Sequence, residues 1–193
     1  LPEILADFMQ SDPDIKVNVR VGSQDDIIRW LSDGNVDFGF GGQLQLPGCE
    51  WLPLLADPEL AILPEDFPTD GMSAFPIAEF RNHPFIMPVY WPEEASLVKQ
   101  LEAHRIEPQF AVDFSDNAPV LAMVEQGLAL SSLPELTLHA YRYHIKTLPL
   151  DPPCCRTVGV TYRQQGSART AANQFLKCLH QWTKEREAGQ QSL

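Results

Sequence analysis

The opening of the chain alternates between helical and extended hydrophobic patterns. Apolar side chains first recur every three or four residues, which predicts an amphipathic helix over Leu1–Gln10. Apolar and polar side chains then alternate one by one over Ile15–Val21, which predicts a strand. Ser23 and Gly34 suit the start and the end of a second helix, and Val36–Phe40 is expected to be another strand. This order is typical of a parallel sheet.

The rest of the chain repeats this alternation of strands and helices. Short strands are expected near Trp51–Leu55 and over Glu59–Leu63. Strands and helices then alternate, starting with a strand, in the order Phe85–Val89, Pro92–His104, Phe110–Phe114, Pro119–Gln126, Leu128–Leu133 and Pro134–Arg142. The strands Ile145–Leu150 and Arg156–Arg163 and a helix after Ser167 complete the chain. The order predicts an α/β fold with residues 1–64 and 157–193 in one lobe and residues 65–156 in a second.

Composition narrows the classes of function. The net charge is −12, from 26 acidic and 14 basic residues, and a surface this negative repels nucleic-acid phosphates. No apolar run approaches the roughly 20 residues of a membrane-spanning helix, so no membrane contact is expected. The four cysteines form no CxxC motif, which favours reduced thiols in a cytoplasmic protein.

Motifs of known catalytic or cofactor chemistry are missing from the sequence. No GxSxG, HExxH or GxxxxGK[ST] motif occurs. Gly39-Phe40-Gly41 is only a fragment of a dinucleotide-binding fingerprint. The histidines lack a metal-binding spacing except for His139 and His144, which lie five residues apart on a polar stretch and are interpreted as surface residues. We therefore expect no catalysis, no cofactor and no metal.

Ligand-binding residues are instead expected where predicted strands end, because open α/β sheets bind ligands beyond the carboxyl ends of their strands. The candidates for effector binding are Ser23, Gln24, Gly41, Gly42, Pro88, Tyr90, Trp91, Asp116 and Asn117. The helix start at Ser23 can hold an anion, and the paired glycines allow close approach of a ligand. The aromatic pair can cover an apolar group, and the last two residues can fix polar groups.

Each candidate also has a purely structural interpretation. Ser23 is a helix cap whatever else it does, and Gly41-Gly42 can be a simple turn. Tyr90 and Trp91 can be packing residues, and Asp116-Asn117 can merely begin a helix. The sequence leaves these alternatives open.

Several segments together resemble the effector-binding domain of LysR-type transcriptional regulators. They are "LPEILADFMQSDPDIKVNVRVGSQDDIIRWLSDGNVDFGFGG", "LADPELAILPEDFP", "HPFIMP", "AVDFSDNAPVLAMVEQGLALSSLPEL" and "LPLDPPCCRTVGVTYR". Their order and separations follow the family nearly from end to end. The resemblance implies two Rossmann-like lobes joined by two crossover strands, similar to type 2 periplasmic binding proteins. It also implies an inducer or co-inducer in the cleft, contacted near Gly22-Ser23.

The resemblance carries expectations about partners too. Family members have an upstream winged helix-turn-helix domain and a first strand, and both are absent from this sequence. DNA would be contacted only through that absent domain, and RNA polymerase contact is expected only of the full-length protein. Homodimers or homotetramers are implied, with self-association through Leu1–Gln10, Ile15–Val21 and Pro119–Gln126.

The mechanism implied is an effector that bridges both lobes and thereby rearranges the oligomer. One alternative is a periplasmic solute-binding protein of a transporter, which would be secreted and monomeric. Another is a small α/β enzyme similar to prephenate dehydratase, which would need a catalytic Thr or Ser set that the sequence does not single out.

Overall fold

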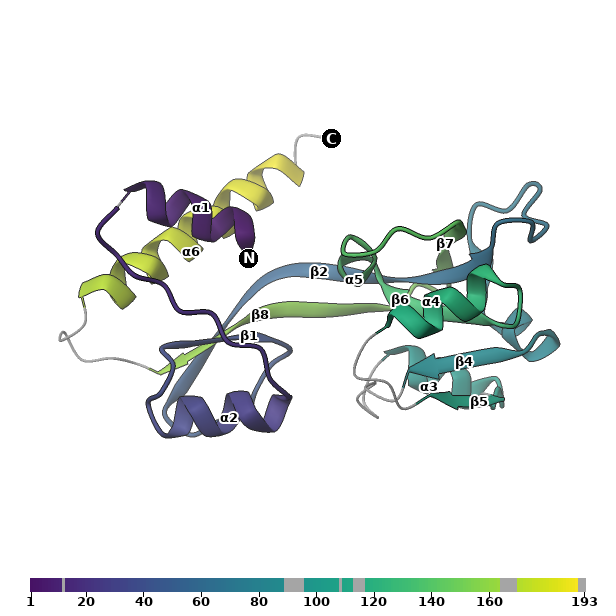
Figure 1. The fold of residues 1–193 in the computed structure, drawn as a ribbon, viewed down its shortest axis with the longest axis horizontal. Helices are drawn as coiled ribbons and strands as arrows, with labels where there is room; N and C mark the ends of the chain where they lie inside the picture. The colour runs from purple at the N-terminus through teal and green to yellow at the C-terminus, as the bar shows by residue number, and fades with distance from the viewer. Residues whose placement is uncertain (12, 89–95, 108, 113–116, 164–169, 191–193) are drawn as a thin grey trace. The chain divides into compact units, whose positions relative to one another are not determined.

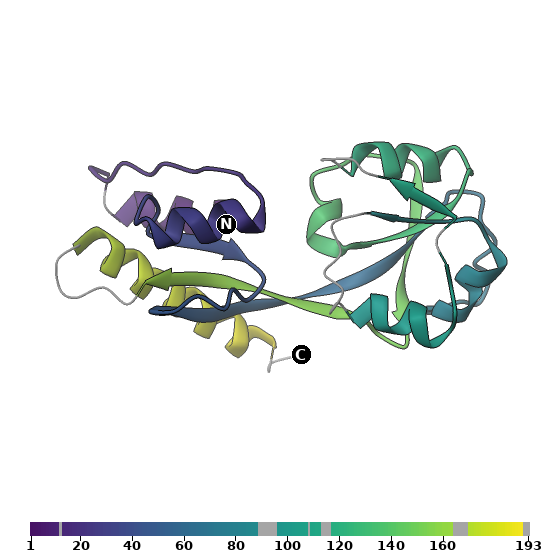
Figure 2. The ribbon, with the colours of Figure 1, turned by 90° about the horizontal axis from the view of Figure 1, so that it is seen from below.

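The computed structural model describes residues 1–193 except 12, 89–95, 108, 113–116, 164–169 and 191–193. Helices and strands mix throughout, so the α/β class predicted from the sequence is confirmed (Figures 1 and 2). The chain divides into two compact units. Unit 1 comprises Leu1–Leu55 and Thr157–Leu193, and unit 2 comprises Ala56–Arg156.

Unit 1 packs three helices around strands β1 (Phe38–Gly41) and β8 (Cys155–Arg163) and the first part of β2 (Cys49–Pro64), which follow one another in the sheet in the order β1-β8-β2. The helices are α1 (Pro2–Ser11), α2 (Gln24–Ser32) and α6 (Thr170–Gln190). Strand β1 pairs antiparallel with β8, with Phe38 opposite Tyr162. Helix α1 lies against α6 (Figure 1), and the rings of Phe8 and Phe175 have centroids 4.9 Å apart. Ile4 and Phe8 of the predicted apolar stripe therefore form part of the core of this unit, whereas Leu1 and Met9 remain exposed.

The strand predicted over Ile15–Val21 is wrong, because the structure shows this segment as irregular backbone. The alternation appears in the burial of its first four residues only, because residues 18–21 are all exposed. Ile15 and Val17 pack partly on the unit 1 core, whereas Val21 is 95% exposed. Alternation fixes which side chains face inward, but a strand also needs a hydrogen-bonded neighbour. This segment has no such ladder among the described residues, so the parallel strand–helix–strand unit expected here is not formed.

Unit 2 contains a parallel set of three strands with helices beside it. Its elements are β3 (Phe75–Pro76), the 3₁₀ helix η1 (Ile77–Asn82), β4 (Phe85–Pro88), α3 (Ser96–Ala103), β5 (Phe110–Val112), α4 (Ala118–Glu125), β6 (Leu130–Pro134), α5 (Glu135–Leu138) and β7 (Ile145–Asp151). Strand β4 lies between β5 and β6 and is parallel to both. The core of unit 2 includes three phenylalanine rings in a row: the ring centroid of Phe80 lies 4.8 Å from that of Phe75 and 4.5 Å from that of Phe85.

Strand β2 (Cys49–Pro64) is continuous where the sequence pattern predicts two short strands. Its second half pairs antiparallel with β6 and β7. Residues 56–64, placed in the first lobe by the sequence analysis, consequently belong to unit 2. Both β2 and β8 have residues in each unit, so the chain passes between the units twice, as the sequence analysis expected. In the described part of the chain, none of the helices has the length and apolar character needed to cross a membrane.

Candidate ligand-binding site

The start of α2 is closed by a reciprocal set of hydrogen bonds between Ser23 and Asp26. The Asp26 amide donates to Ser23 Oγ at 3.2 Å, and the Ser23 amide donates to Asp26 Oδ2 at 3.1 Å. The Ser23 hydroxyl also donates to Oδ2 at 2.8 Å. These hydrogen bonds, with a smaller contribution from Arg29, lower the pKa of Asp26. The helix cap predicted at Ser23 is confirmed, here as a capping box with Asp26, and Ser23 and Gln24 remain exposed at the helix start.

The glycines of this region divide into two kinds. A Cβ added at Gly22 would lie 2.6 Å from Trp30, and one at Gly39 would lie 2.5 Å from Ile27. These two glycines allow α2 to pack closely on the neighbouring backbone. At Gly41 and Gly42 a Cβ would meet no atom within 4 Å. The end of β1 therefore faces open space, as a ligand-contacting backbone requires.

In unit 2 the parallel register brings several strand ends to one edge. Pro88 lies opposite Val112, and these residues are the last of β4 and β5. Tyr90, Trp91 and Asp116 lie outside the described residues. Asn117 occupies the N-cap position of α4 but makes no capping hydrogen bond with its side chain. Strands β4 and β5 therefore end at the same edge of the sheet.

A charged pair at this edge was not anticipated from the sequence. Arg156 donates from Nε to Asp57 Oδ2 at 2.8 Å, and its Nη2 lies 2.7 Å from the same oxygen. Asp57 Oδ1 accepts the Leu136 amide at 3.0 Å. The Asp57 side chain is fully buried, whereas that of Arg156 is 49% exposed. The guanidinium therefore keeps donors available to an anionic ligand.

Glu59 lies two residues further along β2 and is 2% exposed. In the described part of the chain, its Oε2 has no hydrogen-bond partner. Burial raises the pKa of Glu59 to about 8; Arg156 opposes this shift and Asp57 adds to it. At neutral pH the side chain is consequently a neutral carboxylic acid. The sequence did contain one indication of this cluster. Asp57 and Glu59 occupy alternate positions of an apolar strand, and alternate side chains of a strand point to the same face.

Ser96 ties the start of α3 to β8. Its Oγ accepts the Cys155 amide at 3.1 Å. Burial raises the pKa of the Cys154 and Cys155 thiols, so both keep their protons near neutral pH. Thiolates are the reactive form of cysteine, and these thiols therefore lack the activation that nucleophilic catalysis needs.

The fold and these strand ends define an α/β ligand-binding domain of two units connected by two long strands. The family model of the LysR substrate binding domain matches residues 1–184. The chain therefore belongs to this family of transcriptional-regulator domains, as its sequence segments predicted.

Two curated relatives are longer than this chain. The uncharacterized HTH-type transcriptional regulator YvbU of Bacillus subtilis strain 168 is 25% identical over 183 residues, which are 92% of this chain and 61% of that protein. The transcriptional activator protein LysR of Escherichia coli K12 is 27% identical over 143 residues, 73% of this chain and 46% of that protein. The chain thus spans only part of these relatives.

Solved structures have the same fold. The Synechocystis PCC6803 CcmR regulatory domain in complex with 2-PG superposes with a TM-score of 0.78 at 22% identity, covering 95% of this chain and 90% of that one. The effector-binding domain of QuiR in complex with shikimate also gives 0.78, at 19% identity and with the same coverage. A BenM variant effector-binding domain gives 0.80 at 16% identity, covering 97% and 89%. The expected type 2 periplasmic-binding-protein-like fold is confirmed.

Proposed function

We propose that this chain is the effector-sensing domain of a LysR-type transcriptional regulator. It binds a small molecule, releases it unchanged, and controls transcription by a ligand-linked rearrangement of the oligomer. DNA is contacted through a separate N-terminal domain of the full-length, cytoplasmic protein. The match of residues 1–184 to the LysR substrate binding family carries this proposal. A ligand can drive such a rearrangement only through its different affinities for the two states.

The effector contacts that we propose lie at the strand ends of each unit. In unit 1 they are Ser23, Gln24, Gly41 and Gly42, and in unit 2 they are Pro88, Tyr90, Trp91, Asp116 and Asn117. The open space beside Gly41 and Gly42 supports the first set. The common edge of β4 and β5 supports the second. The half-exposed guanidinium of Arg156 favours an anionic group on the effector.

Ser23→Ala is expected to weaken binding of a small carboxylate about tenfold, the effect of losing one hydrogen bond to a charged group. A thermal-shift screen of C3–C7 mono- and dicarboxylates supplies the ligand, and calorimetry then measures its affinity. Ser32→Ala is the matched control, because that exposed hydroxyl donates to Ile28 O at 2.8 Å at the other end of α2. Equal affinity in both variants would remove Ser23 from the site.

We also propose self-association through Leu1–Gln10, Ile15–Val21 and Pro119–Gln126. Exposed apolar side chains on the first two segments support this, since Met9 is 46% and Val19 60% exposed. Met9→Glu is expected to raise the dimer dissociation constant at least tenfold in sedimentation velocity, because it places a charge in an apolar interface. Met72→Glu, at a 39% exposed side chain outside these segments, is the control. Identical dissociation constants for both variants would contradict the assignment.

A further inference from the structure

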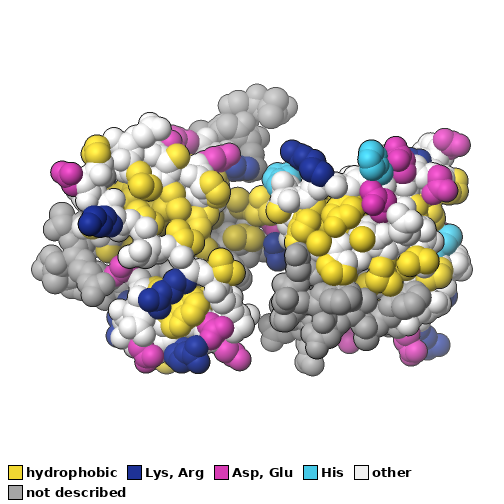
Figure 3. All heavy atoms as spheres, viewed as in Figure 1, with side chains coloured by type: hydrophobic (Ala, Val, Ile, Leu, Met, Phe, Trp, Pro, Cys, Tyr) yellow, Lys and Arg dark blue, Asp and Glu magenta, His cyan; other side chains and the backbone are white. Residues whose placement is uncertain are grey.

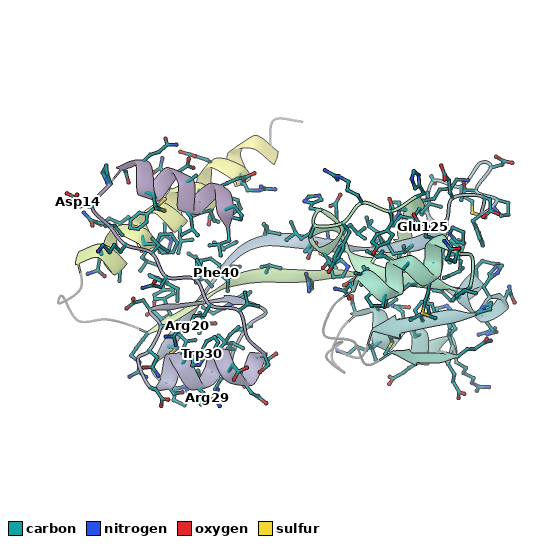
Figure 4. All side chains as sticks on the ribbon, in the orientation of Figure 1. Asp14, Arg20, Arg29, Trp30, Phe40 and Glu125 are labelled. Atoms are coloured by element: carbon teal, nitrogen blue, oxygen red, sulfur yellow. The ribbon has the colours of Figure 1, made fainter. Side chains whose placement is uncertain are left out.

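Glu59 differs from the other acidic residues of the described chain, because it is buried and its Oε2 lacks a hydrogen-bond partner. Among the described residues, Asp57 and Glu59 are the two buried acids, at 1% and 2% exposure. The other described acids are at least partly exposed, and Figure 3 shows several of them (magenta) at the surface. Glu125, labelled in Figure 4, has a partner, since its Oε1 accepts the His144 amide at 2.7 Å. Buried polar groups are normally paired, so Oε2 of Glu59 leaves a hydrogen bond unmet.

The cation nearest to Glu59 in the described part of the chain is already paired with another acid. The charges that act on Glu59 are those of Arg156 and Asp57. Asp57 Oδ2 accepts the guanidinium of Arg156 at 2.8 Å from Nε. The Cys154 and Cys155 thiols, whose pKa is raised by burial and further by the charge of Glu59, are neutral neighbours. An ionised Glu59 would therefore need a cation from outside the described chain, because buried charges are normally paired.

The Glu59 carboxyl lies close beneath the surface of unit 2. The Glu59 amide donates to Cys154 O at 2.9 Å, and the next two residues of the chain, Cys155 and Arg156, are exposed. Glu59 is also opposite Pro134, the last residue of β6, and β6 runs parallel to β4. It consequently lies at the edge of the sheet where the parallel strands end. This is the edge of unit 2 that we propose to contact the effector.

We propose that the effector is an amino acid, whose ammonium group binds the Glu59 carboxyl and whose carboxylate binds the Arg156 guanidinium. This inference rests on the proposed function, because it names the class of effector for the same site. The ammonium group supplies the hydrogen bond and the positive charge that Glu59 lacks. The carboxylate meets the donors on the exposed side of Arg156. Glu59 lies about 7 Å along β2 from Asp57, the partner of Arg156, so one small molecule can span both groups.

Binding of an ammonium group is expected to release a proton. Glu59 has a pKa of about 8 in the free protein, so it holds its proton at pH 7. A cation beside the carboxyl favours the ionised form and lowers this pKa. The proton leaves for the buffer, and the negative charge formed on Glu59 is matched by the ammonium group. A carboxylate that has no ammonium group would leave Glu59 protonated and release no proton.

Matched pairs of acids test this inference. A thermal-shift screen of the protein amino acids, beside carboxylates without an amino group, supplies the tightest-binding compound of each class. Calorimetry then compares the amino acid with the hydroxy acid of the same side chain, as for alanine with lactate or aspartate with malate. The amino acid is expected to bind about tenfold more tightly at pH 7, the effect of one hydrogen bond between charged groups. Its binding enthalpies in phosphate and in Tris are expected to differ as release of about one proton requires.

Glu59→Gln keeps the shape of the side chain and removes its ability to ionise. It is expected to bind the amino acid about tenfold more weakly, to lose the preference over the hydroxy acid and to release no proton. Glu79→Gln is the matched control, because the Glu79 carboxylate already accepts Asn82 Nδ2 at 3.0 Å in η1. It is expected to behave as the unmodified chain.

The outcomes separate this inference from the proposed function. Binding of carboxylates with no preference for an amino group would overturn the inference and leave the proposed function intact. A preference for the amino acid that persists in Glu59→Gln would overturn the assignment of the ammonium group to Glu59. If no compound of either class binds, the proposed carboxylate effector fails together with the inference.

Discussion

Replacing Arg156 by methionine is expected to lower the free energy of unfolding by about 2–4 kcal/mol, because it leaves a buried carboxylate without its cation. The Asp57 side chain is fully buried, and after the substitution it would keep only the Leu136 amide among the bonds described here. Methionine preserves most of the apolar stem of arginine, so the loss reflects charge rather than volume. Urea denaturation at pH 7 measures the change.

The matched control is Arg29→Met, which breaks the exposed pair with Asp26. Arg29 is 64% and Asp26 34% exposed, and exposed pairs are worth about 1 kcal/mol or less. Asp57→Asn combined with Arg156→Met is expected to restore part of the lost stability, since it removes the uncompensated charge. If Arg156→Met and Arg29→Met cost the same, the pair does not organise this edge of unit 2.

The second large effect is a pH dependence of the free energy of unfolding, which originates at Glu59. Its pKa is about 8 in the folded protein, compared with an ordinary value of 4.5. Well below pH 4.5, Glu59 is protonated in both the folded and the unfolded protein, so it does not lower the free energy of unfolding. As the pH rises towards 8 the unfolded state ionises first, so folding stability falls, by about 2–4 kcal/mol between pH 5 and pH 8.

Glu59→Gln keeps the shape of the side chain and removes its titration. It is expected to flatten this decline, so that the variant is more stable than the unmodified chain at pH 8 and nearly equal to it at pH 5. Chemical denaturation across this range measures the slope. Glu65→Gln, at a side chain that is 70% exposed, should leave the slope unchanged. A slope at Glu59→Gln as steep as that of the unmodified chain would show that Glu59 ionises normally in the folded protein.

The sequence was enough to predict those elements whose formation depends only on nearby residues. The helix cap at Ser23 and the amphipathic helix α1 are set by neighbours three or four residues apart, and the sequence predicted both correctly. Strand formation over Ile15–Val21 depends on a partner backbone, which local alternation cannot supply. The continuity of β2 likewise depends on its pairing with β6 and β7.

The residues of the candidate site also divide into those that nearby sequence predicts and those that only the folded chain brings together. The open strand end at Gly41 and Gly42 follows from a local glycine pair, and the structure shows the space beside it. Asp57 and Arg156, by contrast, are 99 residues apart in the sequence, and only the folded chain brings them together. Their ion pair could not be predicted, although the two acids on one face of an apolar strand were visible.

The central claim is that this domain holds a small molecule at its strand ends without altering it. Native mass spectrometry of the chain with the tightest-binding carboxylate from the thermal-shift screen tests this most directly. The mass of the ligand is measured before binding and again after its release from the complex. The account predicts a complex with one ligand per chain, reduced in Ser23→Ala, and a released ligand of unchanged mass. A released molecule of different mass would contradict it, as would a complex equally abundant in Ser23→Ala and in the unmodified chain.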